Sequence, residues 1–144
     1  MAKAKHTEQQ FLKKYFTIQE AEILLPQIEI ILSRTIKLNK ALELLESIEI
    51  EVYDDNYDAL GRINKANKQF HKLSYEFYDN IEKLESMGCL VKDLELGIVD
   101  FYCRFENRDI FLCWKLGEKG IRFWHEADAG YIGRNPIVDL ARHK

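Results

Sequence analysis

Residues 111–136, FLCWKLGEKGIRFWHEADAGYIGRNP, hold both tryptophans and four of the seven glycines of the chain. The run FLCW at 111–114 is typical of a buried strand, GEKG at 117–120 of a turn, and IRFWHE at 121–126 of a strand that returns. The glycine-rich residues 129–136 then predict irregular backbone, where functional side chains are often held. This stretch therefore predicts a β-hairpin followed by a candidate functional loop.

The residues before this hairpin predict one more strand. From Ile98 the side chains alternate, with Val99, Phe101, Cys103 and Phe105 on one face and Asp100, Tyr102, Arg104 and Glu106 on the other. A turn at 106–109 and a returning strand at 109–116 complete a three-stranded antiparallel meander.

The register of this meander is open, because Asn107-Arg108 is a weak turn signal. A two-residue turn there places Cys103 opposite Leu112, whereas a three-residue turn places it opposite Cys113. The two cysteines match no zinc motif, since such motifs use closely spaced ligand pairs. Two buried thiols are the favoured interpretation, and a ligand or redox pair is the alternative.

The first half of the chain predicts two long helices. Thr17 and Glu20 have the T-x-x-E spacing of a capping box at a helix start. Apolar side chains then recur three and four residues apart, and this seam contains one threonine: Ala21, Leu24, Ile28, Ile31, Thr35, Leu38, Leu42 and Leu45. Pro26 lies inside the pattern and predicts either a kink near 21–22 or a new helix start. Residues 47–56 predict the helix end and a loop.

The second helix has a seam of the same spacing, formed by Leu60, Ile63, Asn67, Phe70, Ser74, Phe77, Ile81 and Leu84. Gly88 predicts a left-handed C-cap after Met87. Two such helices form an antiparallel hairpin whose apolar flanks need further cover, from the sheet or from a second copy of the chain.

These elements predict an α+β fold, in which a long antiparallel helix hairpin (15–88) packs against the three-stranded β-meander and its glycine-rich loop (89–137). Residues 15–144 form a single domain in this prediction. Residues 1–14 are expected to be a flexible tail, and residues 138–144 a second tail.

Composition excludes several classes of partner. The net charge of −3 and the pI near 5.8 argue against nucleic-acid binding. We expect no membrane association, because no apolar run approaches the roughly 20 residues that span a bilayer. Three cysteines without a recognisable secretory signal predict reduced thiols in the cytoplasm.

Six residues of the carboxy-terminal half are candidates for a ligand or partner site: Asp100, Trp114, Glu118, Trp124, His125 and Arg134. The tryptophans either wall a pocket or pack in the core. The arginine suits an anion, or a pairing with Asp100 or Glu118.

A metal site is an alternative for part of this set. Carboxylate and imidazole ligands from Asp100, Glu118 and His125 would suit zinc, iron or manganese. A third interpretation makes Glu118, His125 and Arg134 a buried structural network.

Four pieces of the chain together resemble a known prokaryotic family: YFTIQEAEILLP at 15–26, GIVDF at 97–101, FLCWKLGE at 111–118 and IRFWHEADAGYIGRNPI at 121–137. They are similar to the family catalogued as domain of unknown function 2203. The resemblance implies a small cytoplasmic protein and carries no activity and no catalytic residue.

The leading hypothesis is a non-enzymatic module that self-associates through its helix hairpin and binds a small ligand or a protein. The alternative is a metal-dependent enzyme of hydrolytic or oxygen chemistry that uses His125, Glu118 and Asp100. The sequence names no cofactor, and catalysis is the less expected of the two functions.

Overall fold

The computed structural model describes residues 13–51 and 59–141. They form two compact units, Pro26–Ser86 and a second unit built from residues up to Leu25 and from Met87 onward. We predicted a single domain in which the hairpin packs on the sheet. Both statements concern the two units together, so they stay predictions.

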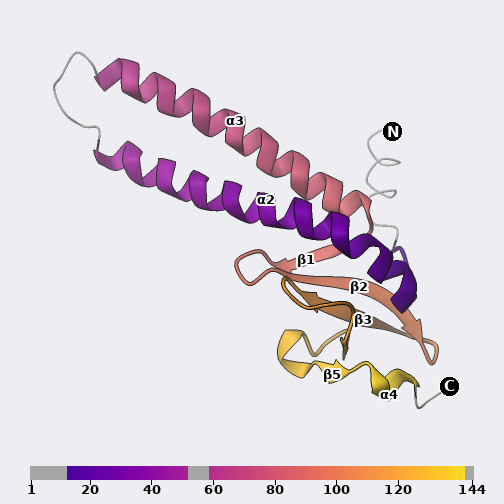
Figure 1. The fold of residues 1–144 in the computed structure, drawn as a ribbon. Helices are drawn as coiled ribbons and strands as arrows, with labels where there is room; N and C mark the ends of the chain where they lie inside the picture. Colours follow the sequence, from indigo (N-terminus) through magenta and orange to yellow (C-terminus); the bar gives the residue numbers. More distant parts are fainter. Residues whose placement is uncertain (1–12, 52–58, 142–144) are drawn as a thin grey trace, which may run out of the picture. The chain divides into compact units, whose positions relative to one another are not determined.

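The unit Pro26–Ser86 is a helix hairpin (Figure 1). Helix α2 spans Ile18–Glu51 and helix α3 spans Ala59–Ser86, so residues 52–58 of the predicted loop lie outside the described chain. Arg34 on α2 forms a salt bridge of 2.9 Å with Glu76 on α3. The seam threonine, Thr35, is fully buried, and its hydroxyl donates to the Ile31 carbonyl at 2.7 Å.

The predicted helix ends are confirmed where local signals set them. The Glu20 amide donates to the Thr17 hydroxyl at 3.1 Å, and the Thr17 amide donates to the Glu20 carboxylate at 3.3 Å. Gly88 has φ 94°, the left-handed conformation expected after α3. No new helix begins at Pro26, because α2 runs through this residue as one helix.

The other unit contains five strands, so the prediction of three was too low. The strands are β1 (Leu90–Asp93), β2 (Ile98–Phe105), β3 (Arg108–Lys115), β4 (Phe123–Glu126) and β5 (Asn135–Pro136), in the order β1-β2-β3-β4-β5. Neighbouring strands are antiparallel. The added strands are β1 and β5, of four and two residues.

The register of the β2–β3 hairpin differs from both expected alternatives. Its two turn residues are Glu106 and Asn107, with φ 49° and 62°, and the strands pair from Phe105 and Arg108. Positive φ at both central residues is the type I′ geometry, which matches the twist of a hairpin. Cys103 therefore pairs with Ile110.

This register decides which side chains share a face of the sheet. Trp114, Leu112 and Trp124 lie on the first face with Val99 and Phe101, since paired residues point to the same side. The second face carries two pairs that matter for function: Asp100 with Cys113, and Phe111 with His125.

The start of the described chain is joined to the sheet within the same unit. The Phe16 ring meets the Phe101 ring edge-on at 5.2 Å, and the Phe16 amide donates to the Tyr102 carbonyl. On the first turns of α2, Glu22 accepts the Ile121 amide at 3.1 Å. At the other end, residues 138–141 of the predicted tail form the short helix α4.

The described helices include none with the length and apolar character needed to cross a membrane.

Candidate functional site

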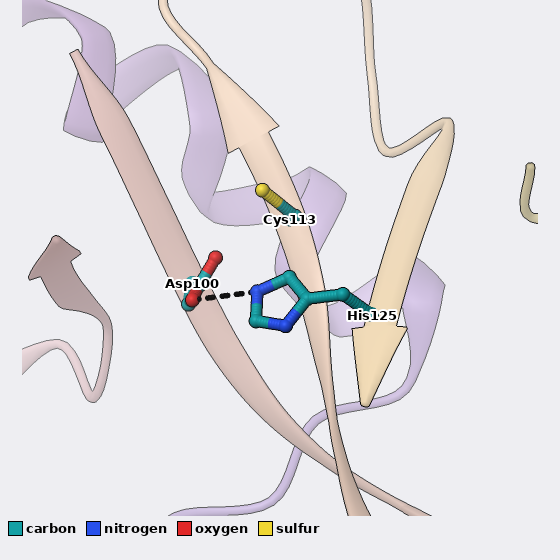
Figure 2. Close-up of side chains that lie close together, drawn as sticks. All are labelled: Asp100, Cys113 and His125. Atoms are coloured by element: carbon teal, nitrogen blue, oxygen red, sulfur yellow. Dashed lines mark hydrogen bonds and ion pairs between the residues drawn. The ribbon is translucent and has the colours of Figure 1, made fainter. Parts of the chain in front are cut away.

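Three adjacent strands bring Asp100, Cys113 and His125 together on the second face of the sheet (Figure 2). Asp100 on β2 is directly opposite Cys113 on β3, and His125 on β4 pairs with Phe111, two residues along β3. The imidazole extends over β3 toward the carboxylate. All three residues are buried, with His125 and Asp100 each 2% exposed.

Both ring nitrogens of His125 are hydrogen bonded to oxygen atoms. Nδ1 lies 2.7 Å from the carbonyl oxygen of Glu126, and Nε2 lies 2.9 Å from Oδ2 of Asp100. A carbonyl oxygen only accepts, so Nδ1 carries a proton and donates it. Nε2 then faces Oδ2 of the Asp100 carboxylate.

The surroundings shift the pKa of two of these groups. Burial lowers the pKa of His125, but the hydrogen bonds to Asp100 and to the Glu126 carbonyl outweigh burial, so the pKa is raised overall. Burial, followed by the charge of Asp100, raises the pKa of the Cys113 thiol to about 12.

The cluster lacks the arrangement of a cysteine nucleophile. A catalytic cysteine needs a histidine nitrogen as its base, with the other nitrogen held by a third group. In this site Asp100 and the Glu126 carbonyl occupy both nitrogens of His125. The raised pKa of Cys113 also keeps the thiol protonated near neutral pH.

A pocket of about 390 Å³ opens above this face of the sheet. Asp100, His125 and Phe111 line it from the strands, together with Ile98. One wall comes from the end of β1 and the turn after it, through Lys92, Asp93 and Leu96. The other wall comes from the loop after β4, through Ala127, Gly130, Tyr131 and Ile132. The volume is at the lower end of the range for small-molecule sites.

The rim of this pocket carries a positive charge beside an aromatic ring. Lys92 is exposed, and its Nζ lies 5.1 Å from the centre of the Phe111 ring. Asp93 on the same wall is engaged locally, since its Oδ1 accepts the Leu96 amide at 2.8 Å. The pocket thus offers an aromatic floor and a cation at its edge.

Glu118 and Arg134 form a clamp beside this cluster, and Arg134 also interacts with the Cys113 side chain. Two parallel hydrogen bonds of 3.0 Å join the guanidinium to the carboxylate, and Glu118 also accepts the Lys115 amide at 2.6 Å. The guanidinium lies 3.9 Å from the Phe123 ring and 4.5 Å from the Tyr131 ring. This arrangement fixes the loop after β4, and it leaves Glu118 committed to Arg134.

The two tryptophans belong to the first face of the sheet and are 1% and 8% exposed, for Trp114 and Trp124 respectively. The Trp114 indole donates to the Glu118 carbonyl at 2.9 Å. The six candidate residues are therefore divided among three places: the Asp100–His125 pair, the Glu118–Arg134 clamp and the tryptophans of the first face.

A family model described as an uncharacterised conserved protein, DUF2203, matches residues 14–137. The chain belongs to the DUF2203 family. No curated protein and no solved structure matches the chain. The family match includes every pocket-lining residue and all three residues of the cluster.

Sequence reasoning missed several parts of this DUF2203 site. The sequence favours Cys113 as a buried thiol, with a ligand or redox pair with Cys103 as the alternative, and it does not mark Lys92, Phe111 and Tyr131 as site residues. Alternation along β3 and a turn at 106–107 would have placed Cys113 opposite Asp100. The glycine-rich loop predicted at 129–136 supplies one pocket wall through Gly130, Tyr131 and Ile132. No short-range signal marks the other wall, because it meets this loop only through the pairing of the strands.

Proposed function

We propose that this DUF2203 protein is a small-ligand-binding module and that its ligand occupies the pocket over the second face of the sheet. The observation that carries the proposal is the buried Asp100–His125 pair at the floor of a pocket of about 390 Å³. Buried polar pairs that line a pocket supply orientation to a bound molecule, while apolar walls supply affinity.

The lining favours a small aromatic or largely apolar molecule with one anionic group. Phe111, Ile98 and Tyr131 offer apolar and aromatic surface, and Lys92 offers the positive charge at the rim. An anion near Lys92 keeps partial contact with water, which lowers the cost of its desolvation. The module acts on this ligand by binding, without chemistry, in this proposal.

Benzoate is a suitable probe, with benzylamine as its cationic counterpart. We expect benzoate to shift amide NMR signals of residues 92–96 and 127–132, and benzylamine to shift them less. Ala127→Trp fills the pocket mouth and should abolish the benzoate shifts, whereas Ala129→Trp, a matched change at an exposed neighbour outside the lining, should keep them. Equal shifts in both variants, or shifts elsewhere in the chain, would count against this pocket.

A metal-dependent enzyme is the second candidate function, and the contact between His125 and Asp100 favours it. Glu118 is not part of that contact, since Arg134 holds both of its carboxylate oxygens. Turnover of p-nitrophenyl acetate by zinc-loaded protein, lost in His125→Gln, would favour catalysis over binding alone.

The proposal includes self-association of the helix hairpin with a second copy. Phe70 and Phe77 of the α3 seam are only half-buried, and Ile30, Tyr75 and Tyr78 are exposed by 72%, 76% and 68%. A two-helix hairpin covers its seam from one side, and a second hairpin would cover it further. We place the module in the cytoplasm without a nucleic-acid partner, in keeping with its thiols and its net charge of −3.

A further inference from the structure

The side chains of Asp100, Cys113 and His125 can each offer one metal-ligand atom, and these atoms lie within 4.8 Å of one another. Among residues 13–51 and 59–141, they are the one group of three or more His, Cys, Asp and Glu residues with this spacing. The strands β2, β3 and β4 hold one ligand each, so the positions depend on sheet pairing and not on a mobile loop (Figure 2).

The hydrogen bonding of His125 is that of a metal ligand. Its Nδ1–H donates to the Glu126 carbonyl at 2.7 Å, which fixes the ring and directs the Nε2 lone pair toward Asp100. Metal-binding histidines are commonly oriented in this way by a backbone carbonyl or a carboxylate on the other nitrogen. The Nε2 and Oδ2 atoms lie 2.9 Å apart, and each presents a lone pair to the other. A cation or a shared proton must therefore lie between them.

Asp100 adds an independent observation. Its Oδ1 is buried and accepts no hydrogen bond of standard geometry from any described residue. A buried carboxylate oxygen without a partner is costly, because it loses its hydration and gains no compensating contact. A divalent cation held by the three side chains would compensate this carboxylate oxygen.

We propose that Asp100, Cys113 and His125 bind one divalent transition-metal ion, with zinc as the best match, and leave one coordination position open to the pocket. Mixed sulfur, nitrogen and oxygen ligands suit zinc, and three protein ligands with an open fourth position characterise zinc sites that act on a bound molecule. Asp100 and His125 line the pocket, so a donor atom of a molecule in the pocket can take the fourth position. Only the contact between the pocket molecule and the metal rests on the proposed function.

Cobalt(II) tests the ligand set in the intact protein, because thiolate ligation gives a near-ultraviolet charge-transfer band. Protein stripped with a chelator should bind one equivalent of cobalt(II) with this band, and zinc should displace it. Cys113→Ser should lose the band, and Asp100→Asn and His125→Gln should each weaken cobalt(II) binding by at least about tenfold. Cys103→Ser alters a β2 thiol outside the cluster and should behave as the wild type.

The wild type and Cys103→Ser keep the test decisive even if a substitution of a buried ligand prevents folding. Absence of stoichiometric cobalt(II) and zinc binding in these two proteins overturns the proposal, as does binding without a thiolate band. Circular dichroism of each variant separates lost binding from lost structure. If the protein binds metal but benzoate causes no shifts, the ligand proposal is overturned and the metal proposal stands. If benzoate causes shifts but no metal binds, the metal proposal is overturned and the ligand proposal stands.

Discussion

Arg134 holds the loop after β4 through contacts that each depend on its planar guanidinium. The group is hydrogen bonded twice to Glu118 and lies close to the rings of Phe123 and Tyr131. Its side chain is 13% exposed, and that of Glu118 is 20% exposed. A charge pair at this depth is partly shielded from water, so loss of Arg134 leaves the Glu118 carboxylate with the Lys115 amide but without its cation.

Arg134→Met should lower the free energy of unfolding by about 2–3 kcal/mol, because it leaves the Glu118 carboxylate half-buried and unpaired. Urea unfolding measures this loss. The double variant Glu118→Gln/Arg134→Met should recover part of it, since the unpaired charge is then removed. Arg122→Met, an exposed arginine of the same unit, is the control, and an equal loss in both single variants would contradict the clamp.

The two candidate residues that the structure brings into contact, Asp100 and His125, have chemistry that is rare in a β-strand. Asp100 and His125 stand out because a charged or titratable side chain at a strand position needs a partner when buried. Cys113 did not stand out, because a buried cysteine is ordinary in a strand. The role of Cys113 depends on which residue it faces across the sheet. Cys113 pairs with Asp100 because the observed turn, at 106–107, lies one residue before the predicted turn at 107–108.

The Lys13–Arg104–Asp109 cluster joins the segment before α2 to the β2–β3 hairpin. Asp109 on β3 pairs with Lys13 at 3.0 Å and with Arg104 on β2 at 3.0 Å. Hydrogen bonds from Lys13 and then from Arg104 lower the pKa of Asp109 from 3.8 to about 2. The pairing therefore favours the ionised carboxylate in the folded protein.

This shift predicts how the pairing responds to acid. A depressed folded-state pKa stabilises the protein above the unfolded value of 3.8, and this stabilisation is lost as the pH falls through about 2. Asp109→Asn should thus lower Tm most at neutral pH, and its difference from the wild type should shrink between pH 3.8 and about 2. Thermal unfolding at several pH values measures the difference.

Asp128→Asn, at an exposed carboxylate of the loop after β4, is the control and should show no such pH-dependent difference. A difference between Asp109→Asn and wild type that stays constant down to pH 2 would contradict the lowered pKa. Added salt should also reduce the effect, because Lys13 and Arg104 are half-exposed.

The helices and the sheet differ in how much of them the sequence predicts. The capping box at Thr17 and the C-cap at Gly88 were predicted correctly, because both depend on neighbours within a few residues. The strands β1 and β5 were not predicted, because only their pairing with β2 and β4 identifies them as strands. That pairing is not visible in the local sequence. The turn at Glu106-Asn107 was displaced in the prediction, since glutamate seldom adopts a positive φ.

Self-association involves the chain as a whole, and the helix hairpin is where we expect it. Sedimentation at micromolar concentrations should give a dimer or a larger species that dissociates on dilution. The double variant Tyr75→Lys/Tyr78→Lys places two charges on exposed apolar positions of α3 and should be monomeric, because burying a lysine ammonium in an interface is costly. Helical circular dichroism should be unchanged, since both tyrosines are exposed.

The matched control is Ile132→Lys, which changes the most exposed of the large apolar side chains in the described chain, at 99%, and lies on the pocket loop. It should remain associated to the same extent as the wild type if the hairpin forms the interface. If the wild type stays monomeric at about a hundred micromolar, the self-association proposal is contradicted. A specific interface of standard size has a dissociation constant below this concentration. Dissociation by Ile132→Lys and not by the tyrosine variant would place the interface on the pocket loop, and the bound ligand would then be shared between copies.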